Sequence, residues 1–143
     1  MKTYLVAFSI SVLMTCISCS PKGNDESSTE QADDSEWVEM DSIHLMMTEA
    51  FHPYKDSANL EPARQLANGL AAKAETWASH PLPVIVNNEE VRAMLNKLKS
   101  DTQSFATMVS DGTPDEEIGT ALQALHDNFH GIMEAWHEAR REP

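Results

Sequence analysis

Hydrophobic residues recur every three or four positions along four stretches of this chain, a spacing that places them on one face of an α-helix. The stretches cover residues 35–52, 59–80, 87–112 and the residues from 113 onward. The predicted buried faces comprise Trp37, Met40, His44, Met47 and Phe51; Ala63, Leu66, Leu70, Ala74 and Trp77; Val91, Met94, Leu95, Leu98, Phe105 and Met108; and Ile118, Leu122, Leu125, Phe129, Met133 and Trp136.

Local signals mark where these helices begin and end. Pro53 is expected to end the first helix, and Pro62 falls in the first turn of the second. Two capping boxes, Asn87 to Glu90 and Thr113 to Glu116, open the third and fourth helices. The run 84–86 (Val-Ile-Val) is too short to predict a strand, so the fold class is all-α.

Four amphipathic helices joined by short loops bury their apolar faces best as an up-down-up-down four-helix bundle, which we expect over residues 36–143. A three-helix core with a loosely docked first helix is the alternative architecture. Roughly 110 residues are available for this domain, which is enough for one small core and not for two.

Residues 1–18 have the composition of a secretory signal peptide. Lys2 gives a positive start, and the uncharged apolar run 4–14 is too short for a stop-transfer helix. The pair Ser18-Cys19 resembles the lipobox of bacterial lipoproteins, in which the cysteine thiol is diacylated and the chain is cut just before it. Cys19 is therefore the predicted lipidation site, with Cys16 as the rival position and an ordinary cleaved signal as the alternative.

Residues 19–35 are predicted to be the lipidated cysteine followed by a flexible acidic tether. The segment 20–35 contains no large apolar side chain, so burial of apolar surface cannot offset the conformational entropy that ordering would cost. The expected location is the cell envelope, with the chain anchored to a membrane by its acyl chains. A periplasm-facing domain is favoured over a surface-exposed one, although the acidic residues resemble surface-export signals of some Bacteroidota lipoproteins.

Composition excludes several classes of function. The chain has 23 acidic and 10 basic residues, a net charge of −13 that repels nucleic acid and anionic headgroups. Both cysteines lie in the leader, so the domain offers no thiol for a disulfide, a nucleophile or covalently attached haem. No Ser/His/Asp or Cys/His order and no phosphate-binding glycine loop is evident, so no enzymatic activity is expected.

Histidines are concentrated in the first and last helices. In the fourth helix His126, His130, Met133 and His137 follow at i, i+4, i+7 and i+11, which places them along one side of the helix. Imidazoles at i and i+4 can converge on one metal ion, because their side chains lean over the same turn. The alternative is that these histidines flank the apolar face of the helix and bind no metal.

The antiparallel packing of the first and fourth helices would bring a second set of donors to these histidines. At about 1.5 Å of rise per residue, His44 is expected opposite His126, and Met40 nearer to His130. The predicted ligands are His44, Met47, His126 and His130. Imidazole with thioether suits copper, whereas His44, His126 and His130 with a carboxylate such as Glu49 would suit zinc. Possible additional ligands are Met40, His52, Met133 and His137.

The segment 122–130, which ends in Phe129-His130, resembles the last helix of cytochrome b562, where an aromatic residue directly precedes the haem-ligating histidine. The resemblance implies a non-covalent haem b with Met40 or Met47 as the second axial ligand. The extra histidines His44 and His126 depart from that pattern. Segments 44–56 and 125–136 also resemble small Bacteroidota lipoproteins whose function is unassigned.

The sequence therefore predicts a non-enzymatic envelope lipoprotein that binds copper or zinc through histidine and methionine side chains of its first and last helices. One alternative is a structural or interaction lipoprotein that binds an envelope protein partner and no cofactor. A second alternative is a b-type haem protein.

Overall fold

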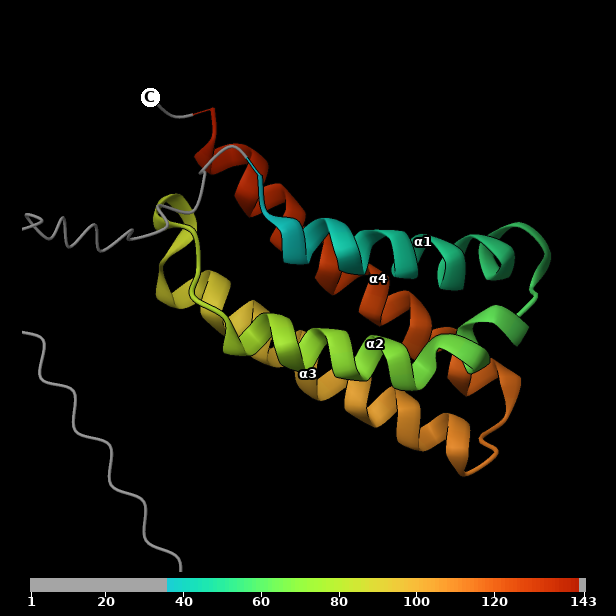
Figure 1. Cartoon of the computed structure of the whole chain (residues 1–143). Coiled ribbons are helices and arrows are strands. Elements are labelled where there is room, and N and C mark those ends of the chain that lie inside the picture. The colour runs from blue at the N-terminus through green and yellow to red at the C-terminus, as the bar shows by residue number, and fades with distance from the viewer. Residues whose placement is uncertain (1–35, 142–143) are drawn as a thin grey trace, which may run out of the picture. The chain divides into compact units, whose positions relative to one another are not determined.

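The structure is a computed structural model that describes residues 36–141 (Figure 1). It contains the helices α1 (Val38–Ser57), α2 (Glu61–Ser79), α3 (Glu89–Ser110) and α4 (Asp115–Ala139), and a short 3-10 helix η1 (Val84–Val86). Each long helix packs against the next along the chain, and α4 packs back against α1. The all-α four-helix bundle is thus confirmed, with no strand in the part of the chain that the structure describes.

The predicted signal peptide, Cys19 and the tether lie outside the described residues. Within residues 36–141, no helix has the length and the apolar character that crossing a membrane requires.

The prediction that Pro53 ends the first helix is wrong. Helix α1 continues one turn beyond it, and Ala58 then stops the helix in a left-handed conformation with φ of 53°. The backbone N–H of Ala58 donates to the carbonyl of Tyr54 at 2.8 Å. Tyr54 stabilises this extra turn, because its side chain is half-buried against the core and lies over Gly119 of α4.

The other helices begin one or two residues later than their sequence signals suggested. In α2 the side chain of Asn59 accepts a hydrogen bond from the N–H of Glu61 at 3.1 Å. In α3 the capping residue is Asn88, not Asn87, and its side chain accepts from the N–H of Val91 at 2.9 Å. Helix α4 starts at Asp115 without a side-chain cap.

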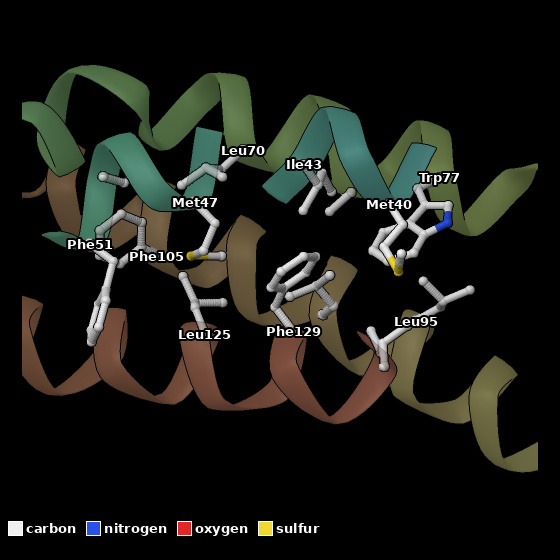
Figure 2. Packing of buried hydrophobic residues seen from close by; sticks show 14 of the residues in the cluster. Met40, Ile43, Met47, Phe51, Leu70, Trp77, Leu95, Phe105, Leu125 and Phe129 are labelled. Carbon is white, nitrogen blue, oxygen red and sulfur yellow. The ribbon is translucent and has the colours of Figure 1, made fainter. Parts of the chain in front are cut away.

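The core runs the length of the bundle and is filled by aliphatic and aromatic side chains from all four helices (Figure 2). Most residues of the predicted apolar faces are buried, and three of the departures are shifts by one position. Ile43 is buried in place of His44, Ala67 in place of Leu66, and Ile132 in place of Met133. His44 is exposed, while Leu66, Met94, Met108 and Met133 are half-buried.

All three tryptophans of the chain meet at one end of the bundle, where α1 begins and where α2 and α4 end. The ring of Trp37 packs edge-on against Trp77 with 4.9 Å between centroids, and lies 5.5 Å from the ring of Trp136. All three side chains are almost fully buried. The contact between Trp37 and Trp136 thus joins the start of α1 to the last turns of α4.

Candidate functional site

His126 is the least exposed of the histidines at the junction of α1 and α4. Its imidazole stacks on the phenyl ring of Phe51, with 3.7 Å between centroids and 16° between planes. Phe51 belongs to α1 and is buried in the core of the bundle, so it covers one face of the imidazole. The side chain of His126 remains 23% exposed, which leaves its outer edge open to solvent.

His130 lies one turn along α4 from His126, and the two imidazoles are close together. Their centroids are 4.3 Å apart and their planes are inclined by 47°. The pairing follows from the i, i+4 spacing, which places successive side chains over the same side of the helix. His130 is exposed, so the pair lies at the surface and not inside the bundle.

A short hydrogen-bond network holds the His126 ring from the other side. Its Nδ1 lies 3.4 Å from a carboxylate oxygen of Asp127, and that same oxygen accepts from the side-chain amide of Gln123 at 2.8 Å. A carboxylate accepts hydrogen bonds, so Nδ1 of His126 is assigned as the protonated nitrogen. The lone pair of Nε2 is then free to bind a cation.

The electrostatics of this site favour a neutral imidazole at His126. Burial lowers the pKa of His126 below its ordinary value, and the charges of His130 and His52 lower it further. The hydrogen bond to Asp127 opposes this shift. The pKa of Asp127 is itself lowered, first by the hydrogen bond from Gln123 and then by that from His126. A neutral histidine beside an ionised carboxylate is the state that binds metals.

Two histidines of α1 border the same junction, in a register that differs from the sequence expectation. His44 was expected opposite His126, but its ring lies 5.4 Å from that of Phe129. Phe51 is the residue that contacts His126, and His52 is near enough for its charge to affect the His126 pKa. We call His44, His52, His126 and His130 the α1–α4 histidine cluster.

The predicted thioether ligands of α1 are buried in the core, whereas His44, His52 and His130 of this cluster are exposed. Met40 and Met47 are 5% and 1% exposed, and Figure 2 shows Met40 beside Trp77 and Met47 between Leu70 and Leu125. The exposed imidazoles of His44 and His130 therefore lie outside the layer that the two sulfur atoms occupy. Of the Met–His pair that the cytochrome resemblance implies, the methionine is thus a core residue and His130 a surface residue.

The two remaining predicted donors of α4, Met133 and His137, line a surface hollow of about 370 Å³ with His130, Glu134 and Arg141. His80, which follows the last residue of α2, lies outside this lining, and its Nδ1 is 2.9 Å from a carboxylate oxygen of Glu39. In residues 36–141, no group of three or more His, Cys, Asp or Glu side chains is arranged to hold a metal ion.

No protein-family model, curated protein sequence or solved structure matches this chain. The likeness to cytochrome b562 and to Bacteroidota lipoproteins therefore stays at the level of the segments that suggested it.

Sequence reasoning missed three contributors to the site: Phe51, Asp127 and Gln123. Phe51 was assigned only to the core, and its role against His126 depends on the exact helix register. Asp127 and Gln123 could have been found from the sequence, because Gln123 and Asp127 stand at i and i+4 and Asp127 is adjacent to His126.

Proposed function

We propose that this chain is a non-enzymatic metal-binding protein that holds zinc or copper at the His126–His130 pair. The observation that carries the proposal is the 4.3 Å separation of the two imidazole centroids at the α1–α4 histidine cluster. Two imidazoles within one helical turn can both direct a nitrogen lone pair at one ion.

The surroundings of His126 support the same proposal. Its contact with Asp127 has the arrangement found in metal proteins, where a carboxylate orients the histidine and raises its basicity as a ligand. Burial lowers the pKa of His126, which favours the unprotonated ring, the form that binds a metal ion. The exposed position of His130 leaves the ion accessible to water or to a further ligand.

Further donors would come from α1. His44 contacts Phe129, which neighbours His130 in the chain. His52 is close enough to His126 for its charge to lower the His126 pKa. These two histidines are therefore the α1 candidates for a third imidazole. A set of three imidazoles with an open position suits zinc or copper, which both accept neutral nitrogen ligands.

The leader supports an envelope location. The apolar run before Cys19 and the pair Ser18-Cys19 fit a lipoprotein signal, which would attach the bundle to a membrane through acyl chains. Without such an anchor the acidic domain would be repelled by anionic headgroups.

The deciding experiment is a calorimetric titration of the full-length chain with zinc and, separately, with copper(II). The chain carries Cys16→Ser and Cys19→Ser, which remove competing thiols. The double variant His126→Gln/His130→Gln should weaken binding at least tenfold, because both nitrogen donors are removed while the helix is retained. His80→Gln is the matched control, since it removes an imidazole outside the cluster and should bind metal as the parent does. Equal binding by the double variant would refute the proposal.

A second candidate function is an interaction protein of the envelope, and exposed apolar residues favour it. Val84, in the connector before α3, is 81% exposed. Leu45, on the outer side of α1, is 75% exposed. Substituting both with serine would abolish recovery of a co-purifying envelope protein if this candidate holds, and would leave zinc binding unchanged.

A further inference from the structure

The surface hollow beside the C-terminal part of α4 contains a donor set different from that of the His126–His130 pair. Residues His130, Met133, Glu134, His137 and Arg141 line it, and its volume is about 370 Å³. Four of these five residues recur at i, i+3, i+4 and i+7, so a single face of one helix supplies nearly the whole lining.

Helix geometry determines which of these side chains meet. Side chains on an α-helix lean toward its N-terminus, so His137 leans over Met133, four residues earlier. His130 leans by the same rule toward His126, in agreement with the 4.3 Å between their rings. His130 and His137 are about 10 Å apart along the axis, and Met133 stands between them.

Met133, on α4, differs from the two methionines of α1 that the sequence singled out. Met40 and Met47 are buried in the core, whereas Met133 is half-buried and borders the hollow. Its side chain is therefore partly open to solvent, and an imidazole is available one turn away at His137.

We propose that this hollow is a copper(I) site, formed by the sulfur of Met133 and the imidazole of His137, with His130 at its edge. Thioether sulfur is a soft ligand that selects copper(I) over zinc, and copper(I) accepts two or three ligands. Among residues 36–141 no three His, Cys, Asp or Glu side chains are arranged to hold a metal ion, so the donor that distinguishes this hollow is the thioether of Met133.

The size of the hollow adds a consequence for exchange. A single ion occupies a small part of about 370 Å³, so the bound copper would keep an open side toward solvent. A further ligand from solvent can reach the ion on that side. His130 borders both this hollow and the His126–His130 pair, so the two sites would be adjacent on α4.

This inference rests on the proposed metal-binding function only through the shared residue His130, and the test separates the two. The full-length chain with Cys16→Ser and Cys19→Ser is titrated with copper(I) under anaerobic, reducing conditions against a colorimetric copper(I) chelator. The thiols must be absent because they would bind copper(I) more tightly than a thioether does.

Met133→Leu should weaken copper(I) binding at least tenfold and leave zinc binding unchanged, because leucine keeps the volume and removes the sulfur. His137→Gln should weaken copper(I) binding to a similar extent. Met94→Leu is the matched control, since Met94 is half-buried on α3 and borders a hollow that contains no histidine. This control should bind copper(I) as the parent does.

A second readout is the methyl resonance of Met133, which should shift on addition of one equivalent of copper(I) and not of zinc. Retention of full copper(I) affinity by Met133→Leu, or an unshifted Met133 methyl resonance, would overturn the inference. His126→Gln separates the two proposals, because it should reduce zinc binding and leave copper(I) binding unchanged. That result would show that the copper(I) site in the hollow does not depend on the His126–His130 pair.

Discussion

The imidazole of His126 lies flat on the phenyl ring of Phe51, with 3.7 Å between their centroids. This contact joins the core of the bundle to its candidate site, because Phe51 is buried and His126 is open at its outer edge. A change in the core at Phe51 should therefore be measurable as a change in the chemistry of His126.

Phe51→Leu should raise the pKa of His126 toward its ordinary value of about 6.5. The smaller side chain covers less of the imidazole, and burial is the main cause of the lowered pKa. The measurement is the pH titration of the His126 ring proton by NMR. Phe105→Leu is the control, since Phe105 is equally buried but on α3. An unchanged His126 titration in Phe51→Leu would show that the stacked ring does not set this pKa.

Asp127→Asn should lower the pKa of His126 further and weaken zinc binding about tenfold. The carboxylate raises that pKa through its hydrogen bond and its charge, and a neutral amide retains neither effect in full. Loss of a group that orients a metal-bound histidine commonly reduces affinity about 10- to 100-fold. NMR titration and zinc calorimetry measure the two effects. Glu117→Gln, which removes an acidic group from the first turn of α4, should change neither quantity.

The stability of the metal-free protein should decline as the pH falls below about 6.5, and His126 should contribute to this decline. Its pKa is lower in the folded chain than in the unfolded chain, so the unfolded state binds the proton first. The contribution is complete above about 6.5 and is lost as the pH falls toward the folded pKa. Urea unfolding at pH 7.5 and pH 5.5 measures it. If His126→Gln loses as much stability as the parent between these values, His126 does not contribute.

Zinc at a hundredfold excess over its dissociation constant should raise the free energy of unfolding by about 2.7 kcal/mol, because it binds the native state alone. Protonation of the imidazoles competes with the metal, so the increment should shrink over the same acidic range. Thermal unfolding with and without zinc at several pH values measures it. An increment that does not depend on pH would point to carboxylate ligands instead of histidines.

Ala58→Gly should stabilise the fold by about 0.5 to 1 kcal/mol. Ala58 has a φ of 53°, a left-handed conformation that costs an L-residue about 1 to 2 kcal/mol and glycine much less. The added freedom of glycine in the unfolded chain offsets part of this gain. Ala124→Gly is the control: it lies exposed within α4 and should cost about 1 kcal/mol. Chemical denaturation of both variants tests the difference in sign.

The apolar pattern predicted most of the fold because a four-helix bundle depends mainly on which face of each helix is buried. Errors were confined to single positions, such as Ile43 buried where His44 was expected. The continuation of α1 through Pro53 could not be predicted locally, because Tyr54 stabilises that turn by lying over Gly119 of a distant helix.

The candidate site was predictable only where its geometry is local. The pair His126–His130 follows from i, i+4 spacing, and the structure places the rings together. The partners of that pair on α1 depend on how far one helix slides along the other, which loop lengths alone do not determine. In the observed alignment Trp37 lies against Trp136 and His44 lies against Phe129 instead of His126.

Trp37, Trp77 and Trp136 lie together at one end of the bundle, so intrinsic tryptophan fluorescence reports on that end only. Tryptophan emission will follow the packing of that end closely, since all three indole rings are buried there. The opposite end, where Tyr54 crosses Gly119, contains no indole and would open without changing the signal. A fluorescence melt and a circular dichroism melt of this bundle therefore need not coincide, and a difference between them would locate fraying at the Tyr54 end.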